Sequence, residues 1–205
     1  MSENYSSLDK LMHDYNSFTF STAKQYGVTP YQLRKALAQG VLEKPNTGSY
    51  VIAGYAEDDL GLISQHFSRG VVSLVSALIF YDLTDEMPLW NWMTFPKGYH
   101  LGARSVADNF IRAQYRTGRF YSEGITTQTT LNGNKIRIYS MERTLLDYWN
   151  YPDAQPYVRN DAAKRYVENP RRDYSRLLAL ERELYPKSTL SLVIQVLDQA
   201  GSTFS

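Results

Sequence analysis

The sequence of residues 21–52, STAKQYGVTPYQLRKALAQGVLEKPNTGSYVI, determines the fold of the N-terminal part of the chain. Gly27 suits the left-handed backbone conformation in which helices end. Thr29 and Pro30 follow as an N-cap residue and a first-turn proline, so they begin a second helix. Gly40 ends that helix. The stretch therefore predicts two short helices that are joined by a tight turn at a glycine.

The flanking elements complete the order of a winged helix-turn-helix: a helix, a second helix, a glycine turn, a third helix and a hairpin. Apolar residues at helical spacing predict the first helix, and turn residues between two apolar runs predict the hairpin. The predicted elements are a helix at Ser7–Tyr15, an apolar turn at Phe18–Phe20, a helix capped by Ser21, the helix after Pro30, and a strand, turn and strand over residues 41–52.

The third helix is the candidate DNA-reading element. In such motifs one face of this helix is buried and the opposite face enters the major groove. Leu33, Ala36 and Leu37 give the helix a buried stripe. The residues left to face DNA lie on the opposite face of this helix and in the hairpin, which forms the wing, and most of them are polar or basic. The candidate DNA-binding residues are Thr29, Tyr31, Gln32, Arg34, Lys35, Lys44, Asn46, Thr47 and Ser49.

The chemistry of these side chains suggests separate roles. Gln32 can pair with an adenine edge and Arg34 with a guanine edge, whereas Lys35 suits a phosphate. The unpaired N–H groups at the start of the helix also suit a phosphate. The alternative is a three-helix domain whose polar face is merely solvated or contacts proteins.

Composition restricts the function classes. The formal net charge is +1, so a DNA contact requires a local basic patch. The absence of cysteine excludes disulfide scaffolds, thiolate zinc sites and cysteine nucleophiles. Residues 1–14 lack the pattern of a signal peptide, and the apolar stretch Val71–Tyr81 is too short to span a bilayer. We expect a soluble cytoplasmic protein that does not contact the membrane.

The second half predicts a mixed α/β domain that ends in helices, and the fold class is α+β. The polar stretch Gly54–Asp59 is the expected junction, which gives a winged-helix domain at residues 1–56 and a partner-binding domain at residues 57–205. The predicted elements are helices at Leu60–Phe67 and Ser73–Tyr81, strands at Trp90–Phe95, Phe110–Tyr115, Ile125–Leu131 and Lys135–Tyr139, a helix capped by Ser140, and helices from Asp161 onward.

Basic residues are frequent in the middle of the second half. They predict an electropositive face for an acidic partner or for flanking DNA, and a solvated loop and strand edge is an equal alternative. The candidate partner-binding residues are Lys97, Arg104, Arg112, Arg116, Arg119, Lys135 and Arg137.

No pattern in the chain indicates an enzyme. The three histidines show no spacing for a catalytic triad or a metal site, and Ser73 is most simply a helix cap. The chain has no phosphate-binding glycine loop and no serine elbow, so we expect no catalytic residue, no metal and no cofactor. Arg143 and Asp147 have the spacing of a helical ion pair, for which we favour a structural clamp over a ligand site.

Four segments in order resemble the AbiEi-type antitoxins of abortive-infection toxin–antitoxin systems. Their ordered occurrence carries the resemblance, because no single one is highly specific. The segments are the winged-helix stretch Leu8–Ile52, VSLVSALIFYDLTDEMP at Val72–Pro88, MTFPKGY at Met93–Tyr99 and IRIYSMERTLLDYW at Ile136–Trp149.

This resemblance implies a function that the residues alone do not. Antitoxins of this family repress their own promoter at inverted repeats through the winged helix. Their C-terminal domain counters a cognate nucleotidyltransferase-like toxin. The expected partners are therefore operator DNA and such a toxin, with the chain as a monomer or weak dimer. The alternatives are a stand-alone regulator whose C-terminal domain senses a ligand or dimerises, and a nuclease tethered to DNA.

Overall fold

The computed structural model describes residues 6–45 and 48–202 and confirms the predicted α+β class. The chain divides into two compact units. Unit 1 contains the residues up to Ser68 together with Thr127–Arg137, and unit 2 contains Arg69–Thr126 together with the residues from Ile138 onward. The predicted boundary after residue 56 thus differs from the observed division, in which a later hairpin joins the N-terminal unit.

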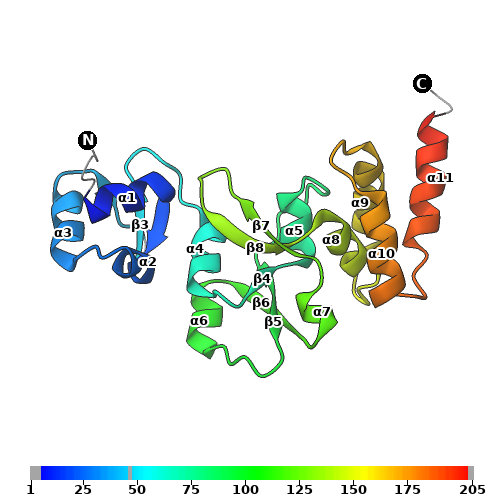
Figure 1. Ribbon diagram of the computed structural model, residues 1–205, viewed down its shortest axis with the longest axis horizontal. Coiled ribbons are helices and arrows are strands. Elements are labelled where there is room, and N and C mark those ends of the chain that lie inside the picture. The colour runs from blue at the N-terminus through cyan, green and yellow to red at the C-terminus, as the bar shows by residue number, and fades with distance from the viewer. Residues whose placement is uncertain (1–5, 46–47, 203–205) are drawn as a thin grey trace. The chain divides into compact units, whose positions relative to one another are not determined.

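Unit 1 contains a winged helix-turn-helix (Figure 1). Its three-stranded antiparallel sheet has the order β1-β3-β2, so the strand between the first two helices pairs with the second strand of the hairpin. The elements are α1 (Ser7–Asp14), β1 (Ser17–Thr19), α2 (Phe20–Gln25), α3 (Pro30–Ala38), β2 (Leu42–Glu43) and β3 (Ser49–Ile52).

The start of this sheet differs from the predicted turn at Phe18–Phe20. Phe18 is fully buried in β1, and its ring stacks on that of Tyr50 with 5.7 Å between centroids. The next helix is capped by Thr19, whose side chain accepts a hydrogen bond from the backbone N–H of Thr22 at 3.1 Å, instead of by Ser21. Burying the phenylalanine and capping the helix two residues earlier converts the expected turn into a strand.

The remainder of unit 1 is α4 (Asp59–His66) and the end of the hairpin formed by β7 (Ile125–Thr129) and β8 (Lys135–Tyr139). A buried carboxylate joins them: Asp58 accepts hydrogen bonds from the backbone N–H of Gly61 at 2.9 Å and from the Asn134 side chain at 2.6 Å, and also from the Thr130 hydroxyl. Gln65 then ties α4 to β1, because its Nε2 donates to the Ser17 carbonyl at 3.0 Å. These side-chain bonds place the junction and the hairpin within unit 1.

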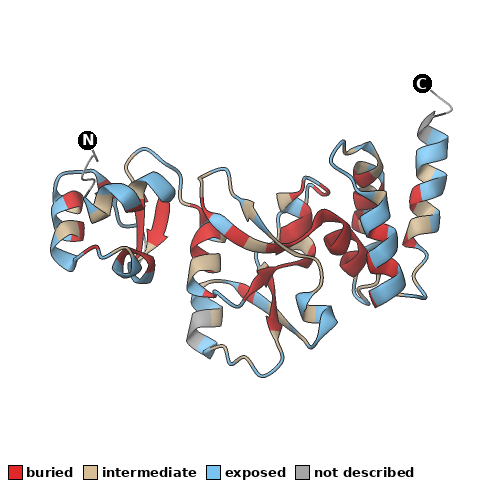
Figure 2. Ribbon diagram, in the orientation of Figure 1, coloured by how far each residue is buried: buried red, intermediate tan, exposed pale blue. Residues whose placement is uncertain are grey.

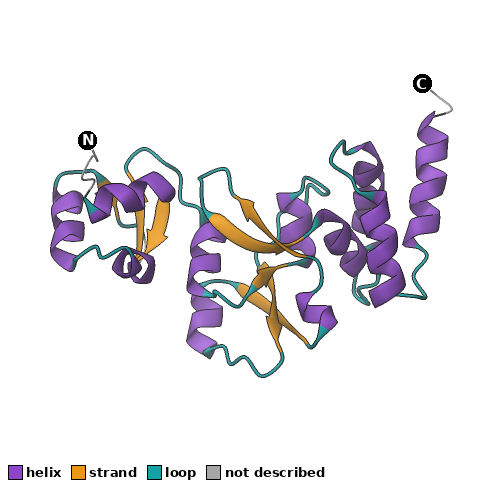
Figure 3. Ribbon diagram, viewed as in Figure 1, coloured by secondary structure: helices purple, strands orange, loops and turns teal. Residues whose placement is uncertain are grey.

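Unit 2 contains most of a five-stranded mixed sheet of order β6-β5-β4-β8-β7, which lies against helices (Figure 3). The residues of β7 and β8 nearest the hairpin turn, 127–129 and 135–137, belong to unit 1. β4 pairs antiparallel with β5 and parallel with β8, and β5 pairs parallel with β6. The strands are β4 (Val71–Val72), β5 (Asn91–Pro96), β6 (Ile111–Arg116), β7 (Ile125–Thr129) and β8 (Lys135–Tyr139). The helices are α5 (Leu74–Phe80), α6 (Ala103–Asp108), α7 (Arg119–Ser122), α8 (Met141–Trp149), α9 (Pro156–Glu168), α10 (Tyr174–Leu184) and α11 (Leu190–Ser202).

Helix α8 is the centre of unit 2. It packs against α5, α9 and α10, and Figure 2 shows that it is buried along nearly its whole length. Ser140 caps it as predicted, since its hydroxyl accepts a hydrogen bond from the Arg143 backbone N–H at 3.3 Å. Ser73 lies at the N-cap position of α5 without a side-chain cap bond. Within the described ranges, no helix has the length and apolar character needed to cross a membrane.

Candidate nucleic-acid interface

Helix α3 begins at a reciprocal cap that its own sequence provides. The Thr29 hydroxyl accepts a hydrogen bond from the Gln32 backbone N–H at 3.2 Å, and the Gln32 side-chain carbonyl accepts one from the Thr29 backbone N–H at 2.8 Å. Pro30 occupies the first turn, and Gly40 follows the helix with a φ of 68°. Such a capping box satisfies two free N–H groups and fixes where the helix starts.

Two of the three residues predicted to form the apolar stripe of α3 are buried, and the third, Leu37, is partly buried against the same core. Leu33 and Ala36 are 2% and 3% exposed and belong to the core that also contains Leu11 and Phe18. On the opposite face the Tyr31 side chain is 67% exposed, and Arg34 and Lys35 are exposed. A helix held by one apolar stripe thus presents an aromatic residue and two cations to solvent.

Gln32 is less suited to base contact than its position in the sequence suggests. Its side-chain carbonyl accepts hydrogen bonds from both the backbone N–H and the hydroxyl of Thr29, the latter at 3.0 Å. A bidentate contact with adenine needs the carbonyl and the amide of the same side chain. The structure therefore does not favour the predicted adenine contact and leaves Arg34 as the candidate for base reading on this face.

The structure describes only part of the wing. Lys44 is exposed, whereas Asn46 and Thr47 lie outside the described residues. Ser49 is 8% exposed and lies in β3 opposite Thr19 of β1, so its position does not favour the predicted DNA contact. The strand continues one residue further toward the turn than the sequence pattern indicated, so this serine is part of the sheet.

The first part of unit 1 carries a modest basic excess. Residues 6–45 contain five lysine and arginine residues and three carboxylates. One of the carboxylates, Asp14, accepts a hydrogen bond from the Tyr26 hydroxyl at 2.7 Å, which lowers the pKa of Asp14 and raises that of Tyr26. The hydrogen bond from Tyr26 thereby favours the ionised form of Asp14. The two cations of α3, Arg34 and Lys35, form no ion pair with a carboxylate among the described residues.

The predicted partner-binding cations are distributed over both units. Lys97, Arg112 and Arg116 lie in unit 2 at the end of β5 and along β6. Lys135 and Arg137 belong to unit 1, where Arg137 donates a hydrogen bond to the Ser68 carbonyl at 2.9 Å. The α7 residue Arg119 forms an ion pair with Glu183 at 2.6 Å. The side chain of Arg104 lies outside the described part of the chain.

The most deeply buried ionic group in the described residues surrounds Arg143, which is 1% exposed. Its Nε donates to Asp147 at 2.7 Å, and its terminal nitrogens donate to the backbone carbonyls of Glu123 and Phe120 at 2.8 and 2.9 Å. The Tyr185 hydroxyl donates to Asp147 at 2.8 Å. The predicted helical pair is therefore present as a structural clamp that ties α8 to α7 and α10.

The electrostatics of this clamp are set by burial. Burial raises the pKa of the Asp147 carboxyl, and the charge of Arg143 and the hydroxyl of Tyr185 oppose that rise. The guanidinium also lies over the Tyr139 ring, with 4.6 Å to the centroid. Because the described partners satisfy the guanidinium and little of it is exposed, the group stabilises unit 2 and does not form an accessible ligand site.

Ser73 belongs to a second polar cluster, on the sheet. Its hydroxyl accepts a hydrogen bond from the Thr94 hydroxyl at 2.9 Å, which in turn accepts one from the Gln114 amide at 2.7 Å. Neither partner can act as a base, and Ser73 is fully buried. The cluster fits the packing of adjacent strands better than nucleophilic catalysis.

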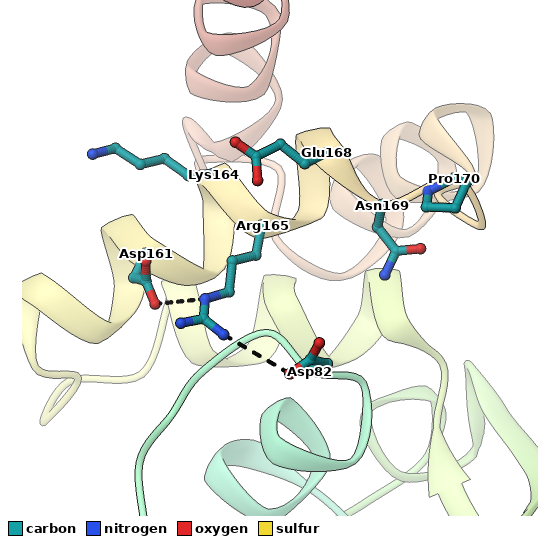
Figure 4. A pocket seen from close by; sticks show the side chains of 7 residues that line it. All are labelled: Asp82, Asp161, Lys164, Arg165, Glu168, Asn169 and Pro170. Atoms are coloured by element: carbon teal, nitrogen blue, oxygen red, sulfur yellow. Dashed lines mark ion pairs between the residues drawn. The ribbon is translucent and has the colours of Figure 1, made fainter.

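A polar hollow lies between α9 and the segment after α5 (Figure 4). Arg165 reaches into it and pairs with Asp161 at 2.9 Å, with Asp82 at 3.9 Å and with Asp85. The hydrogen bond from Arg165 lowers the pKa of the Asp85 carboxyl. Asp82 and Asp85, the carboxylates of the segment after α5, thus belong to a surface ion-pair network. The hollow is lined by Asp82, Asp161, Lys164, Arg165, Glu168, Asn169 and Pro170.

A solved structure shares the fold of this chain. The chain is similar to the crystal structure of RV2827C protein from Mycobacterium tuberculosis, with a TM-score of 0.51 and 14% sequence identity over 95% of this chain and 75% of that one. No protein-family model and no curated protein matches the sequence. At this identity the likeness concerns the fold alone.

Proposed function

We propose that the chain binds duplex DNA through α3 and acts as the autorepressing antitoxin of a toxin–antitoxin pair. The observation that carries the DNA-binding part is the arrangement of α3. Its apolar stripe, Leu33 and Ala36, is buried in a winged-helix core, and its opposite face exposes Tyr31, Arg34 and Lys35. This is the arrangement in which a helix can enter the major groove.

The side chains have different tasks in this proposal. Arg34 contacts a guanine edge, and Lys35 and the wing residue Lys44 contact phosphates. The described N-terminal part of the chain has only a small basic excess, so one copy gains limited electrostatic affinity. Useful specificity therefore comes from two copies that occupy the two halves of an inverted repeat.

The antitoxin part rests on the resemblance of four segments to AbiEi-type antitoxins. In this proposal unit 2 binds a nucleotidyltransferase-like toxin and needs no cofactor. The structure supports a separate role for unit 2, because its core is centred on α8 and contains none of the proposed DNA-contacting residues.

The DNA-binding part is tested with duplex DNA from the chain's own promoter. We expect Arg34→Ala with Lys35→Ala to weaken binding by about 10- to 100-fold. The slope of the logarithm of affinity against the logarithm of salt concentration should become shallower by about 1, which corresponds to the loss of one phosphate contact. Fluorescence anisotropy at several salt concentrations measures both. The matched control is Arg182→Ala with Lys187→Ala, which removes the same charge from exposed positions of unit 2. Equal losses in the two double variants contradict a role for α3.

Neutralisation is tested by co-expression with the product of the adjacent gene. We expect the full chain to restore growth, and the Arg34→Ala, Lys35→Ala variant to restore it equally when both genes are under an external promoter. The experiment uses the full chain, because residues 127–137 pack with the N-terminal unit. Failure of the full chain to restore growth contradicts the antitoxin part and leaves a stand-alone DNA-binding regulator.

A further inference from the structure

Strand β6 forms one edge of the sheet of unit 2 and pairs with β5 alone. At its two ends the carbonyls of Phe110 and Arg116 accept hydrogen bonds from β5 and the residue after it, at 2.7 and 2.9 Å. Alternation along a parallel ladder therefore turns the N–H and C=O groups of Ile111, Ala113 and Tyr115 away from β5. Ile111 is only 3% exposed, so the accessible outward groups are those of Ala113 and Tyr115. Among the described residues these outward groups form no hydrogen bond.

Cations accompany this unpaired edge. Arg112 and Arg116 are four residues apart on the strand, so both lie on one face of the sheet, and Lys97 follows the strand paired with β6. Arg112 is exposed and lies over the Trp92 ring, with 4.4 Å to the centroid. In the part of the chain that the structure describes, none of these three cations forms an ion pair.

An exposed aromatic pair lies at the start of the same edge. Trp90 and Phe110 are 41% and 48% exposed, and their rings are in contact with 6.1 Å between centroids. Phe110 has a φ of 48°, a conformation that non-glycine residues rarely adopt. Aromatic residues of this kind are typical anchors of protein interfaces.

From these observations we propose that β6 binds an added strand from a partner protein, in which acidic residues alternate with apolar ones. The partner's backbone pairs with the outward groups of Ala113 and Tyr115. Its acidic side chains lie on the face of Arg112 and Arg116, and its apolar side chains lie on the opposite face. The inference rests on the proposed function in taking the toxin as this partner.

The other possible occupants fit the edge less well. Antiparallel pairing with a second copy of β6 would place Arg112 and Arg116 beside their own counterparts, and like charges opposite each other destabilise a ladder. A DNA backbone would neutralise the cations, but it has no hydrogen-bond donors for the outward carbonyls. The carboxylates of an acidic strand pair with the cations, and its backbone forms hydrogen bonds with both the outward N–H and the outward C=O groups of β6.

The probe for this inference is a capped peptide of four Glu-Val repeats, titrated into the isotope-labelled full chain. We expect amide resonance shifts in β6 and the aromatic pair, and at least tenfold weaker binding to Ala113→Pro. Proline at position 113 removes an outward N–H and keeps the bonds to β5, and edge strands tolerate it. A Lys-Val peptide of equal length is expected not to bind.

Charge variants and modified probes separate pairing from simple attraction. Arg112→Glu with Arg116→Glu should weaken binding at least tenfold, whereas the control Arg182→Glu with Lys187→Glu should not. If Ala113→Pro does not fold, probes N-methylated at the valines or at the glutamates replace it. Methylation of the backbone amides that face β6 should abolish binding, and methylation of the backbone amides that face away from β6 should leave the affinity unchanged.

Several outcomes overturn the inference. The first group concerns the Glu-Val probe: no binding, amide resonance shifts outside β6 and the aromatic pair, or binding that is unchanged by Ala113→Pro and by both methylated probes. The second group concerns other occupants: self-association of the chain that Ala113→Pro abolishes, or equal amide resonance shifts of β6 when duplex DNA is added. Neutralisation of the co-expressed toxin by a folded Ala113→Pro chain also overturns it and leaves the proposed function intact. Loss of DNA binding through α3 is measured separately and does not bear on this edge.

Discussion

Replacement of Arg143 by methionine is expected to lower the unfolding free energy of unit 2 by about 3–5 kcal/mol, as is typical when one partner of a buried ion pair is removed. The guanidinium is 1% exposed and donates hydrogen bonds to Asp147 and to two backbone carbonyls. Its loss leaves a buried carboxylate whose remaining side-chain hydrogen-bond donor among the described residues is the Tyr185 hydroxyl. Urea unfolding followed by tryptophan fluorescence measures the change.

The pH dependence of this variant has a definite sign. Burial raises the pKa of the Asp147 carboxyl, and without Arg143 less opposes that rise. A folded-state pKa above the unfolded one contributes stability at low pH that is lost as pH rises, so the destabilisation should be smaller at pH 4 than at pH 7. Adding Asp147→Asn should recover part of the loss at pH 7. A loss below about 1 kcal/mol at pH 7 contradicts the clamp.

Replacement of Gly61 by alanine is the second large effect. A Cβ at this position would lie 2.5 Å from the Asp58 carboxylate and 2.6 Å from two atoms of Asn134. The intruding methyl would displace the buried bonds that hold the hairpin in unit 1, so we expect a loss of about 2–3 kcal/mol. Thermal unfolding of the full chain measures it.

The control for Gly61→Ala lies in the same helix. The Ser64 hydroxyl is buried and without a partner among the described residues, so Ser64→Ala should be neutral or slightly stabilising. Alanine is also the better helix former at both sites, and intrinsic propensity alone would make Gly61→Ala stabilising by about 1 kcal/mol. A measured stabilisation would show that α4 and the hairpin do not pack as described.

The local features of the fold could be predicted from the sequence. The cap at Thr29, the glycine at position 40 and the helical spacing of Leu33 and Ala36 lie within one short segment. These signals act through near-neighbour geometry, and the structure has α3 with the expected faces. The helix that Ser140 caps was predicted in the same way.

Features that depend on distant residues could not be predicted. Asp58 bonds to Asn134, 76 residues away, so no local pattern indicated that the hairpin belongs to unit 1. β4 has only two residues, Val71–Val72, both fully buried, and such a run does not show the alternation of a strand. The burial of Ser49 could not be predicted, because the end of a strand depends on its partner, here Thr19.

The central claim is that the exposed face of α3 contacts duplex DNA, and site-specific photo-crosslinking tests it most directly. A photoreactive phenylalanine analogue replaces Tyr31, which is 67% exposed on α3, or Tyr157, which is 62% exposed in unit 2. We expect crosslinks to promoter DNA from position 31 and none from position 157. Crosslinks from position 157 alone, or none from position 31 in a chain that still binds the duplex, would contradict the central claim.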